Sequence, residues 1–362
     1  MTIETRTAGI VMMDTDELQE TDGLVVELKE LNGALARRQQ AAGSAAMRRS
    51  LAQQIGRITQ LHYLCPEEIR ALLGDSPLVG VDGSFGSCGA SFPYLVTFFR
   101  ALARSTRQGV AGNKYWTDKI FSPLLSKDQA RVQGLLDQGL NPEDALAHIR
   151  WETLAAMEAE AGEAALERER PRILLWDGGF ARLATHAPAI WERIKAGVLR
   201  QGTIMLGVAE EIATRTLVKQ MSETGDTPAE AFAGWADREQ LYGMLQPGEI
   251  FRVHGHLDAP CRWGRIYARL SRHPQAIAVD YLAEQAGDLE AAMNFLYTVT
   301  PAHGRGFPLW LDVVDAEVRI TADQVEALLA AYLDPALREL FLRPLRARPT
   351  YNGRGDGSRA HA

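Results

Sequence analysis

The apolar positions of this chain follow two patterns. Between residues 15 and 73 they recur at three- and four-residue steps, as in Leu28, Leu31 and Leu35. This spacing predicts helices, because residues three or four apart share one helix face. Further along, short continuous apolar runs alternate with helical periods. Such runs are typical of buried strands, so the alternation predicts an α/β protein with a mixed central sheet flanked by helices.

Turn and cap residues mark out the elements and the domains. The candidate strands are 78–84, 172–177, 203–208, 249–255 and 265–270, with 94–107 as a strand or a short helix. The candidate helices are a hairpin over 126–170 whose second helix starts at Asn141-Pro142, then 191–199, and 321–333 after a Thr321 cap. We therefore expect an N-terminal helical arm (1–74), a sheet domain (75–345) and a disordered, arginine- and glycine-rich tail (346–362).

Composition and charge narrow the classes of protein. The 362 residues are 46% hydrophobic and 23% charged, which is ordinary for a globular protein. No run is long and apolar enough to span a membrane, and the N-terminus lacks a secretion pattern, so a cytoplasmic location is expected. The 39 basic and 46 acidic side chains give a net charge of −7. This balance excludes a chain-wide basic surface for nucleic acid, but not an acidic metal site with local arginines.

Asp82 and Asp177 are the most informative residues. Each closes a buried apolar run and is followed by glycine. A carboxylate at such a position needs a partner, because removing a charge from water costs several kcal/mol. A magnesium or manganese ion is one suitable partner, and two acids on neighbouring strands suit a two-metal site for phosphodiester cleavage. The competing interpretation is that Asp-Gly is simply a hairpin turn.

Helix geometry selects a third acid. In the helix expected after Asn141, the side chains of Trp151, Leu154, Met157 and Ala161 share one apolar face, and Glu158 lies in its middle. A metal or a catalytic water would explain a glutamate there. The competing interpretation is a buried glutamate paired with an arginine.

Basic and aromatic residues provide candidate contacts to a phosphate backbone. Arg265, Tyr267 and Arg269 alternate along a predicted strand and would share one face. Guanidinium and phenol groups both donate hydrogen bonds to phosphate oxygens. An ordinary solvated strand face explains the same pattern. Further candidates for DNA contacts are Arg100, Arg104 and Arg107.

Taken in order, these landmarks resemble the NurA nucleases of DNA end resection over about residues 78–333. The matching segments are Val-Gly-Val-Asp82-Gly-Ser, Leu-Leu-Trp-Asp177-Gly, Leu-Gly-Val-Ala209, Asp237-Arg with Leu245-Gln-Pro-Gly-Glu249, Ile-Tyr267-Ala-Arg-Leu and Gly306-Phe-Pro-Leu. Each segment alone is weakly specific, whereas their order and spacing are more so.

The resemblance implies an RNase H-like fold with a manganese-dependent site, in which magnesium is also conceivable. Its metal-binding acids fall on Asp82, Glu158 and Asp177, and its tyrosine falls on Tyr267. Many members carry a histidine where this chain has Asp315, with Asp312 as a second candidate for that position. An aspartate still binds metal but is a poorer proton shuttle near neutral pH. The family lysine is displaced, and Lys219 is the nearest basic residue.

The resemblance also implies a biological role. Family members are homodimers that work with a hexameric translocating ATPase, HerA, on single- and double-stranded DNA ends during double-strand break repair. The expected activity is exonuclease and single-strand endonuclease cleavage. The helical arm and the region around Phe341 are the candidate contact surfaces. Two alternatives stay open: an ATPase with a similar strand-acid-glycine loop, and a catalytically weak DNA-binding or scaffolding subunit of the same complex.

Overall fold

The computed structural model describes residues 22–41, 43–107, 113–224, 234–257 and 263–342. By internal contacts the chain divides into two compact units. One takes its described residues from Met1–Ile55 and Ala213–Gln240, and the other comprises those of Gly56–Ile212 and Leu241–Ala362. The expected tail, 346–362, lies outside the described residues. None of the described helices is long and apolar enough to cross a membrane.

The larger unit is built on one mixed sheet. Nine strands of the described chain form it in the order β1-β7-β8-β9-β6-β5-β2-β3-β4. The β2–β5 and β5–β6 pairs are parallel and the other neighbours are antiparallel, which confirms the predicted fold class. The strands are β1 (Gly56–Gln60), β2 (Leu78–Ser91), β3 (Tyr94–Ser105), β4 (Lys114–Phe121), β5 (Ile173–Asp177), β6 (Ile204–Ala209), β7 (Glu249–Leu257), β8 (Trp263–Arg269) and β9 (Ile277–Leu282).

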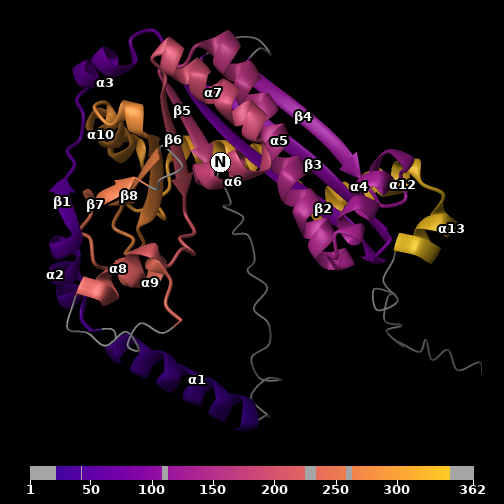
Figure 1. Cartoon of the computed structure of the whole chain (residues 1–362), viewed down its shortest axis with the longest axis horizontal. Helices are drawn as coiled ribbons and strands as arrows, with labels where there is room; N and C mark the ends of the chain where they lie inside the picture. The colour runs from indigo at the N-terminus through magenta and orange to yellow at the C-terminus, as the bar shows by residue number, and fades with distance from the viewer. Residues whose placement is uncertain (1–21, 42, 108–112, 225–233, 258–262, 343–362) are drawn as a thin grey trace, which may run out of the picture. The chain divides into compact units, whose positions relative to one another are not determined.

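Helices cover both faces of this sheet (Figure 1). Helix α5 lies along β2, β3 and β4 and packs against α6 and α7, whereas α11 packs on the opposite face of β2. The helices are α3 (Pro66–Leu73), α4 (Ser126–Asp137), α5 (Pro142–Glu169), α6 (Phe180–His186), α7 (Pro188–Gln201), α10 (Leu289–Val299), α11 (Leu309–Val318), α12 (Ala322–Tyr332) and α13 (Pro335–Leu337), with a 3-10 turn at Ala283–Gln285 and a π turn at Arg338–Leu342.

The smaller unit is helical. It contains α1 (Asp22–Ala41), α2 (Ala45–Ile55), α8 (Thr216–Thr224) and most of α9 (Asp237–Leu241). The buried Arg48 donates a hydrogen bond to the carbonyl of Gln240 at 3.1 Å. Asp237 accepts hydrogen bonds from the Val218 amide at 2.9 Å and from the Thr214 hydroxyl at 2.6 Å. The Arg48 contact joins segments that are 192 residues apart in the sequence.

The structure corrects two of the expected elements. The helical pattern over 15–73 is interrupted by β1 at 56–60, which pairs with β7 at the edge of the sheet. Sheet pairing outweighs helical spacing here, because Ile58 lies opposite Phe251 in that ladder. The first segment of the smaller unit therefore ends at Ile55 rather than at the expected residue 74. The smaller unit also includes residues 213–240. The ambiguous segment 94–107 forms a strand, β3.

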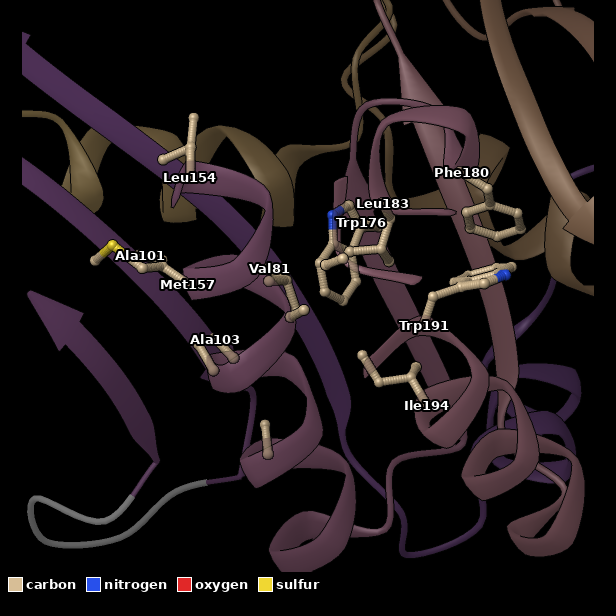
Figure 2. Packing of buried hydrophobic residues seen from close by; sticks show 14 of the residues in the cluster. Val81, Ala101, Ala103, Leu154, Met157, Trp176, Phe180, Leu183, Trp191 and Ile194 are labelled. Atoms are coloured by element: carbon tan, nitrogen blue, oxygen red, sulfur yellow. The ribbon is translucent and has the colours of Figure 1, made fainter. Parts of the chain in front are cut away.

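A cluster of large side chains fills the space between the sheet and α5, α6 and α7. Figure 2 shows Trp176 beside Leu183 and Phe180 beside Trp191, in the same cluster as Val81. Trp176 reaches α5 at Gly162, where an added Cβ would stand 2.6 Å from the indole atom Cζ3. The absence of a side chain at Gly162 is what allows the indole to pack directly on the helix backbone.

We therefore expect Gly162→Ala to destabilise the protein by roughly 1–2 kcal/mol. Alanine normally stabilises a helix interior relative to glycine by up to about 1 kcal/mol, but overpacking a core costs about 1–3 kcal/mol. Gly134 on α4 is the matched control, since nothing lies within 4 Å of an added Cβ there. Urea unfolding checks both variants: Gly134→Ala should be stabilising, and an equal gain from Gly162→Ala would contradict the packing argument.

Candidate active site

Two aspartates mark the place where β2 and β5 separate. The parallel ladder between these strands runs from Leu78–Ile173 to Val81–Trp176, so Asp82 and Asp177 are the next pair in register. The strand β5 ends at Asp177, and Gly178 follows with a φ of 95°, which favours glycine. The strand β2 instead continues antiparallel to β3 as far as Ser91. Asp82 therefore lies within its strand and not at its end, and the interpretation of Asp82-Gly83 as a hairpin turn is wrong.

Two further carboxylates reach the same place from helices on opposite faces. Glu158 of α5 is fully buried and passes beside Gly83, where an added Cβ would stand 2.7 Å from its Oε1 atom. Asp315 comes from α11, on the face of β2 toward which residues 80 and 82 point, and it forms an ion pair with Arg319 at 2.5 Å. The four acids that the sequence analysis selected therefore lie near enough to influence one another's charge, from both faces of the sheet.

The proximity of these acids changes their protonation. Burial raises the pKa of Asp82 to about 8, and the charges of Asp177, Glu158 and Asp315 add to the effect. Burial likewise raises the pKa of Asp177 to about 7, with contributions from Glu158 and Asp315. Asp315 of α11 therefore belongs electrostatically to the cluster, whereas Asp312 is held by Arg305 at 2.5 Å. Perturbed carboxyl groups in one cluster are typical of functional sites.

Glu158 has a positive partner in this structure. Arg182 of α6 lies 2.5 Å from its Oε2 atom and also donates to the carbonyl of Asp177 at 3.2 Å. The indole of Trp176 donates to the same Oε2 at 3.3 Å. Burial raises the pKa of Glu158, and Arg182 opposes that shift. The arginine-paired glutamate of the competing interpretation is therefore present.

The donor set suits a divalent cation in its chemistry. Carboxylate oxygens are the ligands that magnesium and manganese prefer, and the Oε1 atom of Glu158 is buried without a hydrogen-bond partner. Over the described ranges, however, no three acidic, histidine or cysteine side chains converge as finished metal ligands. A cation would have to draw Glu158 away from Arg182. The residues therefore fit a divalent cation in the type of their donor atoms and in the number of carboxyl groups gathered there.

A residue that the sequence analysis missed fixes the loop after Asp177. Asp280 of β9 is buried and accepts a hydrogen bond from the Phe180 amide at 2.9 Å. It also forms a two-point ion pair with Arg265, at 2.6 and 2.9 Å. This pair holds the start of α6, and hence Arg182, in position. The signal in the sequence was an acid inside the apolar run 277–282.

The prediction of a phosphate-binding face on β8 is wrong. Tyr267 is only 1% exposed and stacks on Phe251, with ring centroids 6.3 Å apart. Arg265 is occupied by Asp280, and Arg269 donates to backbone carbonyls, including that of Leu245 at 2.7 Å. The physical reason is that neighbouring side chains cover Tyr267 and occupy both arginines, so this face of β8 is neither solvated nor open to DNA.

The other candidate DNA contacts lie at the surface with acidic neighbours. Arg100 pairs with Asp118 at 2.8 Å and Arg104 with Glu317 at 2.6 Å. Two more candidates are Arg107, 3.5 Å from Glu169, and Lys219, which belongs to the smaller unit and lies 4.0 Å from Glu223. Their contacts with DNA stay predictions.

The mixed sheet and the acids gathered where two parallel strands separate define an α/β protein with a candidate acidic site. The chain belongs to the NurA domain family, whose family model matches residues 77–320. This membership confirms the resemblance described above.

The chain is similar in fold to one solved NurA structure, and two further solved structures are similar to a lesser degree. The NurA nuclease from Sulfolobus solfataricus is 12% identical, with 88% of this chain and 96% of that chain covered and a TM-score of 0.51. A second NurA structure is 9% identical over 86% and 98% of the two chains, with a TM-score of 0.45. Endonuclease V from Bacillus subtilis is 12% identical over 79% and 92%, with a TM-score of 0.37. No curated protein matches this chain.

Proposed function

We propose that this protein is a metal-dependent DNA nuclease. The observation that carries the proposal is the cluster of Asp82, Glu158, Asp177 and Asp315, in which the pKa of Asp82 is raised to about 8 and that of Asp177 to about 7. Manganese, or magnesium, is the cation that these oxygens would hold. Once bound, such an ion activates a water for attack on phosphorus and stabilises the leaving oxygen.

The chain's own residues prepare this site. Asp82 and Asp177 are held side by side by the β2–β5 ladder, and the ion pair of Asp280 with Arg265 fixes the loop that follows Asp177. Arg182 orients Glu158 and opposes the rise in its pKa that burial causes. None of these groups reads a base, so cleavage is expected to be independent of sequence.

The finer role rests on family membership. We propose exonuclease and single-strand endonuclease activity on single- and double-stranded DNA ends in double-strand break repair, by a homodimer working with a HerA-type hexameric ATPase. The helix α1 supports the proposal of a partner-binding surface, because it exposes four apolar side chains along its length: Val26, Leu28, Leu31 and Leu35. An exposed apolar stripe of this kind is typical of an interaction site.

A catalytically weak DNA-binding or scaffolding subunit is the second candidate. Two observations favour it: Asp315 stands where many family members carry a histidine, and the described acids do not converge as finished ligands. The two candidates make opposite predictions about cleavage.

The test is degradation of end-labelled single- and double-stranded DNA with manganese, magnesium or EDTA, with and without the partner ATPase. We expect cleavage with manganese, none with EDTA, and weaker DNA binding at high salt, because phosphate contacts release counterions. Absence of cleavage by folded protein with the ATPase present would reject the nuclease and favour the scaffolding subunit.

A further inference from the structure

An aromatic and basic strip leads away from Glu158 along α5. It consists of Arg182, Trp151, Phe85 and Arg150, and we call it the α5 strip. The Arg182 guanidinium, paired with Glu158, lies 5.9 Å from the centroid of the Trp151 ring. Trp151 meets Phe85 edge to face at 6.2 Å, and Arg150 lies 5.9 Å from the Phe85 ring. These contacts therefore connect Glu158 of the carboxylate cluster with Arg150 at the far end of the α5 strip.

The indole of Trp151 is unusually accessible for its position. The helix α5 is largely buried between the sheet and α6 and α7, yet Trp151 is 45% exposed. The sequence pattern placed it on the apolar face with Leu154 and Met157, which are both buried. Tryptophan is usually well covered in folded proteins. An exposed indole near the proposed active site is therefore suited to stacking on a flat ligand.

The arginines of the strip differ from those that the sequence analysis selected. Arg265 and Arg269 are occupied by Asp280 and by backbone carbonyls. Arg150 forms none of the salt bridges found among the described residues, and its guanidinium lies over the Phe85 ring. Arg182 pairs with Glu158, the carboxylate that a cation would claim. Both strip arginines thus retain donors for phosphate oxygens.

We propose that the α5 strip binds single-stranded nucleic acid and leads its backbone to the carboxylates, an inference that rests on the proposed nuclease function. A base stacks on Trp151, and Arg150 and Arg182 contact the phosphates on either side. Trp151 lies seven residues before Glu158, which is about 10 Å along the helix. The ligand is single-stranded, because in a duplex the base faces are covered by neighbouring bases and are closed to an indole.

Binding is measured separately from cleavage. The full chain carries Asp82→Asn and Asp177→Asn and is kept in EDTA, so that DNA stays intact, and fluorescence anisotropy follows a labelled oligothymidylate. We expect Trp151→Ala to weaken binding roughly 5- to 150-fold, because stacking on an aromatic is worth about 1–3 kcal/mol per base. Trp151→Phe should retain most of the affinity, and binding of a duplex should change less than twofold.

Trp116 compares the strip with the opposite face of the sheet. It is 39% exposed on β4, has the guanidinium of Arg100 5.3 Å from its ring, and points to the face that carries α11 and Asp82. Trp116→Ala should weaken single-strand binding less than Trp151→Ala does. Thermal unfolding establishes that each variant is folded. Should Trp151→Ala misfold, Arg150→Gln tests the strip through a weaker affinity and a smaller salt dependence.

The outcomes separate the strip from the nuclease function. Wild-type affinity of the folded Trp151→Ala chain, a loss caused by Trp116→Ala instead, or no single-strand binding at all would overturn the strip. Cleavage is assayed in parallel with the natural acids and manganese. A Trp151 effect on binding without any cleavage would support the strip and reject the nuclease, and cleavage without a Trp151 effect would do the reverse.

Discussion

Asparagine in place of Asp82 or Asp177 is expected to lower the rate of DNA cleavage in manganese by about a thousandfold or more. Each substitution removes one negative charge and one metal-binding oxygen from the pair that continues the β2–β5 ladder. A catalytic metal contributes several kcal/mol to the reaction, and about 4 kcal/mol corresponds to three orders of magnitude in rate. End-labelled DNA in a single-turnover assay measures the effect.

Asp288→Asn is the control for this experiment. Asp288 is half exposed and forms a 3.4 Å ion pair with Arg172, so its charge has no part in the cluster. That variant should cleave like wild type. Asp315→Asn should have a smaller effect than either central aspartate, since Asp315 is partly neutralised by Arg319. Folded Asp82→Asn and Asp177→Asn variants that retain a tenth of the wild-type rate would place catalysis elsewhere in the molecule.

The same cluster is expected to make the metal-free protein less stable as pH rises. The pKa of Asp82 is about 8 in the folded chain against an ordinary 3.8. Between these values the folded state binds a proton that the unfolded chain has released. The stabilising contribution is therefore complete below about pH 4 and is lost as pH rises through about 8. At about 1.36 kcal/mol per unit, we expect Asp82 alone to lower the free energy of unfolding by about 3.5 kcal/mol between pH 5 and pH 8 in EDTA.

Asp82→Asn should remove most of this fall, because the amide does not ionise. At pH 8 in EDTA the variant should therefore be more stable than wild type, although it is inactive. Manganese should restore the stability of wild type at pH 8, since it binds the folded chain and not the unfolded one, and should help the variant less. Urea unfolding followed by tryptophan fluorescence tests this. If the free energy of unfolding falls equally with pH in the two proteins, Asp82 titrates at its ordinary pKa and the prediction is wrong.

The elements with the clearest local patterns could be predicted from the sequence. The helix α5 begins after the Asn141 cap, whose side chain accepts from the Asp144 amide at 2.8 Å. The helix α12 begins after Thr321, which forms a capping box with Gln324. In both cases a cap and a helical period lie within a few residues of each other, so no distant contact is needed to specify them.

Part of the candidate site follows from the same local reasoning. Asp82, Glu158 and Asp177 stand out because each is an acid within an apolar pattern, and an unpartnered buried charge is costly wherever the chain folds. The sequence cannot say which partner compensates it. Arg182 neutralises Glu158 in the structure, and the two residues lie on different helices, 24 positions apart. Nothing in the pattern around Arg182 distinguishes it from the chain's other arginines.

By itself, then, the sequence determined the α/β alternation, the principal helices and the acids of the cluster, because periodicity and the cost of burying charge act over a few residues. Only the tertiary structure decided which strands are interior. The alternation of Arg265 and Tyr267 is the same for an edge strand and for an interior one, and pairing with β7 and β9 buried the tyrosine and gave the arginine to Asp280. Neighbours that come from distant parts of the chain set burial and ion pairing, and local spacing does not encode them.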